Sequence, residues 1–112
     1  MTANNLAKFS NRALGFVRVA TVSPRLKVAD CQFNVGEIIS AMQRAQADNV
    51  EVLVTPELSI TGYTCADLFH QTTLIEGAKV GLKAIVDASE QFDGIVFVGA
   101  PLVLDDKLYN CA

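Results

Sequence analysis

The sequence has 112 residues, of which 51% are hydrophobic and 19% are charged, and its formal net charge is −3. This length fits one domain at most, and the composition is that of a globular chain with a buried core. The negative charge gives no electrostatic footprint for nucleic acid or for an anionic membrane surface. No apolar run approaches the roughly 18 residues that cross a bilayer, and residues 1–16 lack the features of a signal peptide.

The three cysteines, Cys31, Cys65 and Cys111, are odd in number and widely spaced. This pattern argues against a disulfide framework, and a reducing, cytoplasmic setting is the simplest interpretation. We expect Cys31 and Cys111 to serve as small apolar residues.

The first elements in chain order are a lead-in, a strand and a helix. Residues 1–14 are mixed and polar, so we expect a lead-in with at most one helical turn, followed by one domain over residues 15–112. Residues 16–22 are rich in β-branched side chains and predict a strand that Pro24 ends. Asn34 with Glu37 forms a capping-box spacing that predicts a helix over residues 35–47. Its apolar positions recur at helical spacing: Val35, Ile38, Ile39, Met42 and Ala45.

Residues 50–55 form the second predicted strand, and their nearly continuous apolar run is typical of a strand covered on both faces. Strand, helix and strand in this order predict a βαβ unit with parallel neighbouring strands. Pro56 restricts the residue before it to an extended conformation and ends the strand. Glu57 is therefore expected just beyond the carboxyl end of a strand, where ligand crevices of α/β sheets lie.

The elements after Glu57 follow the same kind of signals. Gly62 offers a turn with positive φ. Thr64 with Asp67 and Thr73 with Glu76 repeat the capping-box spacing, which predicts a short helix over 65–70 and then a third helix. The inner face of the third helix is predicted to hold Ile75, Ala78, Leu82, Ile85 and Val86.

A further strand is predicted over residues 95–98, followed by a hairpin over 102–110 that turns at Asp105 and Asp106. The sequence stops inside its last predicted strand. We therefore expect the sheet to be truncated here and the chain to be a piece of a longer protein, with an unpaired strand edge.

Glu57 is the main candidate for a catalytic residue. A carboxylate set among apolar neighbours at a strand end keeps its proton more readily than usual, because desolvation disfavours the charged form. That property suits a general base. The alternative is a glutamate that caps a turn or pairs with a surface lysine, and position alone leaves both open. Tyr63 could present its phenol to the same crevice, although an isolated tyrosine is more often a packing residue.

Cys65, Asp67 and His70 suggest a catalytic triad, which we reject because all three fall within one short predicted helix. Residues five apart on a helix do not face each other well. His70 is the only histidine, and no C-x-x-C pair accompanies it, so no metal site is expected. Neither a dinucleotide-binding glycine pattern nor a P-loop is present, so no cofactor site is expected in this chain.

Residues 55–71, TPELSITGYTCADLFHQ, resemble the glutamate segment of the carbon–nitrogen hydrolase (nitrilase) superfamily, whose general form is P-E-x-x-x-x-G-Y. With the opening GFVRVATVSP and the segment GAPLVLDDKLYNCA, residues 13–112 resemble the N-terminal glutaminase domain of bacterial glutamine-dependent NAD synthetases. The resemblance implies an α/β fold. The chain would form part of an α-β-β-α nitrilase-type sandwich, with βαβ units and helices covering a mixed sheet.

The resemblance also implies a chemistry. In that family a glutamate, a lysine and a cysteine hydrolyse the side-chain amide of glutamine through a thioester on the cysteine. Glu57 matches the catalytic glutamate, which acts as general base and acid, and Tyr63 matches a tyrosine beside the substrate pocket. The released ammonia is used by a C-terminal, ATP- and magnesium-dependent synthetase domain of the same chain, which amidates nicotinic acid adenine dinucleotide. Homo-oligomers are usual in the family.

The chain departs from the family in two respects: Cys65, Cys111 and Lys107 match neither the nucleophilic cysteine nor the lysine, and the ATP-dependent domain is absent. Because such groups act as a unit, these 112 residues alone are expected to be inactive. Two alternatives stay open. The chain could be a fragment of another amidase of the superfamily, or a non-catalytic α/β module that recruits a partner by strand addition.

Overall fold

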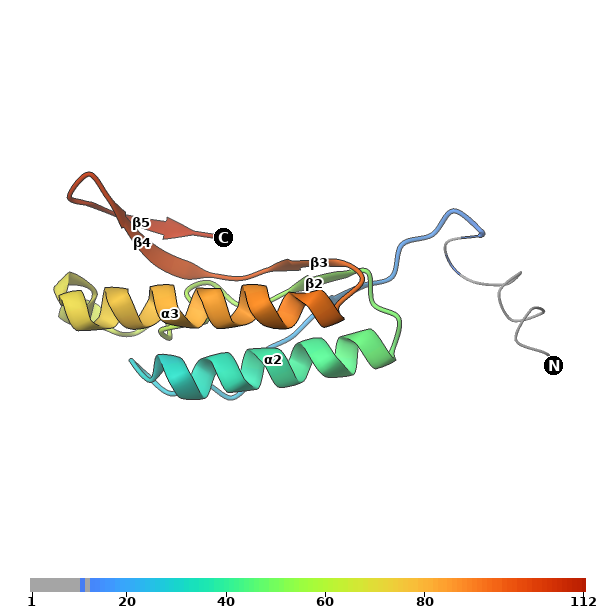
Figure 1. Ribbon diagram of the computed structural model, residues 1–112, viewed down its shortest axis with the longest axis horizontal. Helices are drawn as coiled ribbons and strands as arrows, with labels where there is room; N and C mark the ends of the chain where they lie inside the picture. Colours follow the sequence, from blue (N-terminus) through green and yellow to red (C-terminus); the bar gives the residue numbers. More distant parts are fainter. Residues whose placement is uncertain (1–10, 12) are drawn as a thin grey trace.

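The computed structural model describes residue 11 and residues 13–112. The expected lead-in lies almost wholly outside these residues, and its boundary stays a prediction. The described elements confirm an α/β architecture (Figure 1). They are β1 (Val19–Thr21), α2 (Cys31–Ala47), β2 (Val52–Val54), η1 (Ala66–His70), α3 (Thr72–Ala88), η2 (Ser89–Gln91), β3 (Ile95–Phe97), β4 (Ala100–Leu104) and β5 (Lys107–Cys111).

The strands form two separate groups. β1, β2 and β3 make a parallel sheet in that order, in which Ala20, Leu53 and Val96 lie side by side. α2 and α3 are the crossovers of two successive βαβ units, as predicted. β4 and β5 form an antiparallel hairpin. The hairpin follows β3 after only two residues and extends the line of that strand beyond the sheet (Figure 1).

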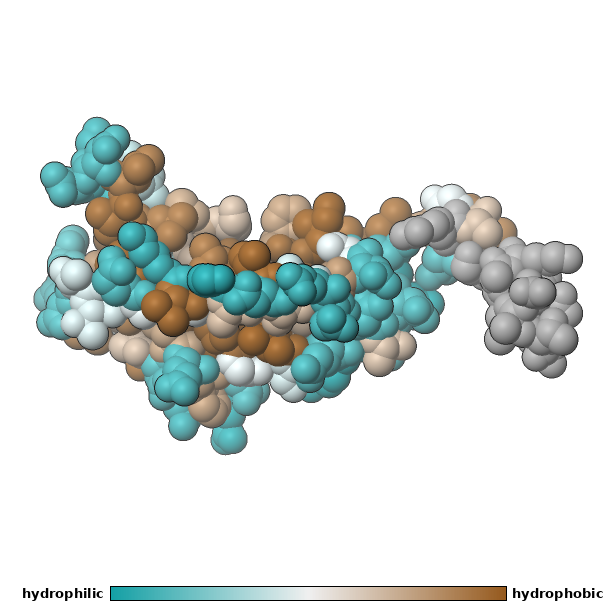
Figure 2. All heavy atoms as spheres, in the orientation of Figure 1, coloured by the Kyte–Doolittle hydropathy of each residue, from teal (hydrophilic) through white to brown (hydrophobic). Residues whose placement is uncertain are grey.

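Both helices lie on one side of the sheet (Figure 1). Two crossovers of the same hand that proceed in one direction across a parallel sheet place their helices on the same face. Leu53 on the covered face is 2% exposed, whereas Val19 and Phe97 on the other face are 66% and 47% exposed. The expectation of a strand covered on both faces is therefore wrong for the described residues. Figure 2 shows hydrophobic side chains along the side of the sheet that faces away from the helices.

α2 begins earlier than the capping-box pattern predicts. Its N-cap is Asp30, whose side chain accepts a hydrogen bond from the backbone N–H of Phe33. Asn34 belongs to the first turns of the helix, and its side chain is wholly buried. Its amide oxygen accepts the backbone N–H of Lys27, and its amide nitrogen donates to the carbonyl oxygens of Lys27 and Ile60. The predicted capping role of Asn34 is wrong because its side chain serves a distant loop. The helix ends at Ala47, as predicted.

The core lies between the two helices and the covered face of the sheet. Its buried members include Ile38, Met42, Leu53, Ile60, Ala78, Ile85 and Phe92. α3 packs directly on α2 at Gly81, where an added β-carbon would lie 2.7 Å from a methyl carbon of Val35. Gly81 therefore permits the close approach of the two helices, which outweighs its low helix propensity.

α3 and η1 also start without the predicted caps. Gln71 is the N-cap of α3 and Cys65 that of η1, and neither forms a side-chain capping bond. Residues 66–70 form a 3₁₀ helix. On α3, Val86 is 58% exposed, so its predicted place on the inner face is wrong.

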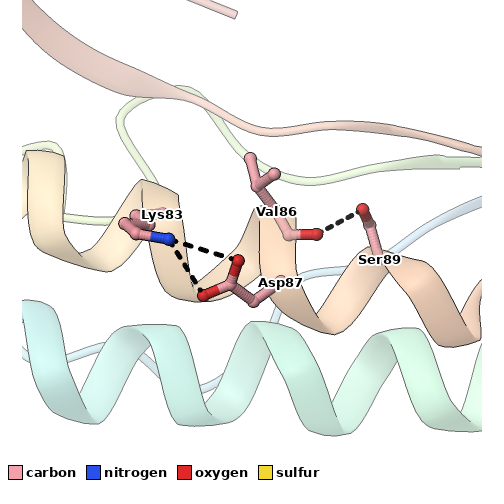
Figure 3. Close-up of polar contacts among 4 residues, drawn as sticks. All are labelled: Lys83, Val86, Asp87 and Ser89. Atoms are coloured by element: carbon pink, nitrogen blue, oxygen red, sulfur yellow. Dashed lines mark hydrogen bonds and ion pairs between the residues drawn. The ribbon is translucent and has the colours of Figure 1, made fainter.

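The end of α3 is held by local contacts (Figure 3). The ammonium of Lys83 lies 3.4 Å from the carboxylate of Asp87, one turn away, and both side chains are exposed. Such a pair contributes about 0.3–0.5 kcal/mol. The hydroxyl of Ser89 donates to the carbonyl oxygen of Val86 at 2.6 Å. None of the helices in the described part of the chain is long and apolar enough to cross a membrane.

Candidate active site

Glu57 follows the carboxyl end of β2 after Thr55 and Pro56, at the place that the sequence predicts. Its side chain is exposed in the described chain. The expected desolvation of this carboxylate is therefore wrong: Leu58 and Ser59 after it are buried, but the side chain of Glu57 stays in contact with solvent. The backbone around it is nevertheless held firmly on both sides.

Thr55 and Ser59, on the two sides of Glu57, are both buried and are joined to each other through their hydroxyl groups at 2.8 Å. The backbone N–H of Thr55 donates to the carbonyl oxygen of Phe97 at 3.0 Å, which continues the ladder between β2 and β3. The hydroxyl of Thr55 lies at the same distance from that oxygen. The hydroxyl of Ser59 donates to the carbonyl oxygen of Gly99 at 3.5 Å, so the loop that carries Glu57 is tied at both ends to the end of β3.

The residue directly after Glu57 has an unusual backbone. Leu58 adopts the left-handed region with φ of 53°, a conformation that costs a non-glycine residue about 1–3 kcal/mol. Its carbonyl oxygen accepts the backbone N–H of Gly62 at 2.8 Å and that of Thr61 at 3.2 Å. Gly62 has φ of 84°, which confirms the predicted turn. The tight turn over 58–62 therefore fixes the direction in which Glu57 leaves β2.

Gly99 brings the end of β3 against this turn. A β-carbon at position 99 would collide with the backbone of Pro56, Glu57 and Leu58. The carbonyl oxygen of Gly99 accepts the backbone N–H of Ile60 at 3.2 Å. Only glycine permits this approach of two backbones, and the sequence pattern alone did not single it out.

Asn110 on β5 is the side chain that meets Glu57. Its amide nitrogen donates a hydrogen bond to Oε1 of the Glu57 carboxylate. Sequence reasoning missed this contact, although a signal was present. A two-residue turn at Asp105 and Asp106 fixes the hairpin register and sets Asn110 opposite Pro101, close to the end of β3.

A hollow of about 220 Å³ lies beside the Glu57 loop. It is lined by Leu58, Phe69, Pro101, Leu108, Tyr109 and Asn110. Most of this lining is apolar, while the Asn110 amide supplies a polar edge toward Glu57. The arrangement can hold the aliphatic part of a small substrate with its polar end near the carboxylate.

Tyr63 lies on the turn after Gly62 and is 65% exposed. Its role beside a substrate stays a prediction.

The rejected triad residues have other surroundings. Cys65 is buried, and its thiol donates to the carbonyl oxygens of Thr61 and Gly62 at 3.2 and 3.4 Å. Asp67 and His70 are exposed on η1.

Among residue 11 and residues 13–112, no three His, Cys, Asp or Glu side chains are grouped so that they could hold a metal ion. Burial raises the pKa of the Cys31 thiol, and Cys65 and Asp30 add to this effect.

Similar proteins point to one family. The chain is 31% identical over 104 residues to the glutamine-dependent NAD(+) synthetase of Mycobacterium leprae, which covers 93% of this chain and 15% of the relative. It is 34% identical over 96 residues to the rat protein of the same name, covering 85% of this chain and 13% of that protein. The chain therefore spans about 15% of the length of the curated relatives it matches.

Solved structures agree with these relatives. A glutamine-dependent NAD(+) synthetase from Cytophaga hutchinsonii matches 85% of this chain with a TM-score of 0.73 and 31% identity, and the match covers 16% of that structure. An amidase from Nesterenkonia sp. matches 76% of this chain and 32% of its own with a TM-score of 0.67 at 22% identity, which is a likeness of fold. The carbon-nitrogen hydrolase family model matches residues 18–112. The chain belongs to the carbon–nitrogen hydrolase family.

Proposed function

We propose that this chain is the first part of a glutaminase domain that hydrolyses the side-chain amide of glutamine, and that Glu57 is its general base. The observation that carries the proposal is the placement of Glu57. Its carboxylate lies beyond the carboxyl end of a parallel strand, on a turn held by Thr55 and Ser59, beside a hollow of suitable size. The similarity to glutamine-dependent NAD(+) synthetases supports the choice of glutamine as substrate.

The proposed reaction uses Glu57 twice. The carboxylate takes the proton of a cysteine thiol, and the resulting thiolate attacks the amide carbon of glutamine while a lysine stabilises the oxyanion. Glu57 then returns the proton to the leaving nitrogen, which departs as ammonia and leaves a thioester. A water molecule gives a proton to Glu57 and attacks the thioester, glutamate is released, and Glu57 returns the proton to the cysteine thiolate, which restores the free thiol. The cysteine and the lysine belong to parts of the domain that this chain does not include.

The ammonia is consumed by a synthetase domain C-terminal to this one in the full-length protein, which uses ATP and magnesium to amidate nicotinic acid adenine dinucleotide to NAD. Tyr63 lies at the entrance for glutamine. The full-length protein assembles as a homo-oligomer in the cytoplasm, without contacts to nucleic acid or membrane.

The test is the variant Glu57→Gln in the full-length protein, because a carboxamide has the shape of the carboxylate but cannot take a proton. We expect glutamine hydrolysis and glutamine-dependent NAD synthesis to be lost, while NAD synthesis from added ammonia continues. An equal loss of both activities would show that Glu57 has a structural role.

The same assays separate the two alternatives. Hydrolysis of simple aliphatic amides without any NAD synthesis would identify another amidase of the superfamily. Absence of both activities in a folded, full-length protein would favour a non-catalytic module.

A further inference from the structure

We infer that Asn110 is a positioning residue for Glu57. Its side-chain amide fixes the orientation of the carboxylate by binding Oε1, so that Oε2 faces the proton that it must take. This inference rests on the proposed function of Glu57 and adds to it a group from a different part of the fold. It depends on the hydrogen bond between the two side chains and on the way in which their backbones are joined.

The register of the hairpin places Asn110 beside Glu57. Asp105 and Asp106 both have positive φ, as a type I′ turn requires. A two-residue turn of this type fixes the pairing of every residue behind it, which sets Asn110 opposite Pro101 and Cys111 opposite Ala100. Asn110 lines the hollow beside Leu58, together with its strand neighbours Leu108 and Tyr109.

The two backbones that carry this hydrogen bond are coupled through Gly99. On one side, Gly99 contacts the peptide groups around Glu57 and accepts the N–H of Ile60. On the other side, it directly precedes β4, which pairs with the strand of Asn110. Both backbones are therefore held relative to each other, and only the rotamers of the two side chains stay to be fixed. The hydrogen bond supplies that last restraint.

An asparagine suits this task because its donor is neutral. A lysine or arginine at position 110 would add a positive charge that holds the carboxylate in its ionised form and weakens it as a base. An amide N–H restrains one carboxylate oxygen and adds no net charge. The second oxygen stays available, and a restrained carboxylate loses less freedom when the reacting groups align.

The test compares three variants of the full-length protein: Asn110→Ala, Asn110→Asp and, as a control on the same hairpin, Lys107→Ala. Lys107 is exposed and lies three residues from Asn110 on β5. We measure kcat and KM for glutamine hydrolysis, NAD synthesis from ammonia, and the midpoint of thermal unfolding. Asn110→Ala is expected to lower kcat for glutamine about 10- to 100-fold, the scale of loss for a misplaced catalytic group, with a smaller change in KM.

Asn110→Asp tests the pH dependence of the rate, a property that would not change if Asn110 had only a structural role. The new carboxylate beside Glu57 repels its charged form, so the acid limb of the pH–rate profile is expected to shift to higher pH. Lys107→Ala should leave kcat and the profile unchanged. All variants should keep ammonia-dependent NAD synthesis and the unfolding midpoint of the parent protein.

Two results would overturn the inference. One is a kcat for Asn110→Ala within twofold of the parent value while Glu57→Gln is inactive. That result would refute the role of Asn110 but leave the proposed function of Glu57 in place. The other is a parallel loss of both activities with a lowered unfolding midpoint, which makes Asn110 structural. Persistence of glutamine hydrolysis in Glu57→Gln would instead refute the proposed function itself.

Discussion

Gly99 lies so close to the turn after β2 that a β-carbon at position 99 would be 2.6 Å from the carbonyl oxygen of Pro56. That distance is shorter than any comfortable contact between a carbon and an oxygen atom, and the atoms in the way belong to backbone. The end of β3 and the Glu57 loop can therefore occupy their present places only while position 99 has no side chain.

Replacing Gly99 by alanine is expected to destabilise the full-length protein by about 1–3 kcal/mol, the usual cost of overpacking, and to displace Glu57. Urea denaturation and a glutaminase assay measure the two effects. Gly36→Ala is the matched control, because a β-carbon there meets no atom within 4 Å and alanine favours the helix. Equal stability of the two variants would contradict the close approach.

Asn34→Ala is expected to destabilise the fold by about 2–4 kcal/mol, because it leaves backbone groups of Lys27 and Ile60 without their buried partner. Asn34→Asp should also destabilise, since a carboxylate cannot donate to the two carbonyl oxygens. Denaturant midpoints measure both changes. Gln43→Ala, at an exposed position of the same helix, should change stability by less than about 0.5 kcal/mol.

The alkylation of Cys31 should depend on pH in a way set by its surroundings. Because burial raises the pKa of this thiol, its reactive thiolate forms at higher pH in the folded protein than in urea. The unfolded chain loses the proton first, so the stability contributed by the protonated thiol falls as the pH rises past the ordinary cysteine range and through the raised pKa. Iodoacetamide labelling with peptide mass spectrometry measures the pH of half-maximal rate. Coincident pH values for folded and unfolded protein would contradict this expectation.

The hairpin turn can be improved. Asp105 and Asp106 both adopt positive φ, and Asn-Gly is the pair that this turn type favours. Asp105→Asn with Asp106→Gly is expected to stabilise the protein by about 1 kcal/mol, because strain and the repulsion of two neighbouring carboxylates are both removed. Thermal unfolding checks this change, and a lowered midpoint would mean that the turn is of another kind.

The sequence predicts the order of the elements well, because hydrophobic spacing distinguishes the two long helices from the short strands. Helix starts are predicted less well. Asn34 with Glu37 has the spacing of a capping box, yet Asn34 is buried and binds a loop seven residues before it and another 26 residues after it. A local pattern cannot distinguish a capping amide from one that bridges distant backbone.

In the candidate site, too, features set by neighbouring residues are predictable and features set by distant contacts are not. The place of Glu57 follows from Pro56 and the apolar strand before it, which are neighbours in sequence. Its exposure depends on how many layers cover the sheet, and its partner Asn110 is 53 residues away. That contact could have been predicted only from the hairpin register combined with the short link between β3 and β4.

The short link between β3 and β4 also determines how the hairpin can move. A rotation about Val98 and Gly99 would swing the hairpin as a rigid arm, with its tip at Asp105 about 20 Å from the pivot and Asn110 only about 7 Å from it, at ~3.3 Å per residue. A displacement of the tip is therefore reduced to roughly a third at Asn110. Glu57, held against Gly99 itself, lies at the pivot, where a displacement of the hairpin tip would disturb its geometry least.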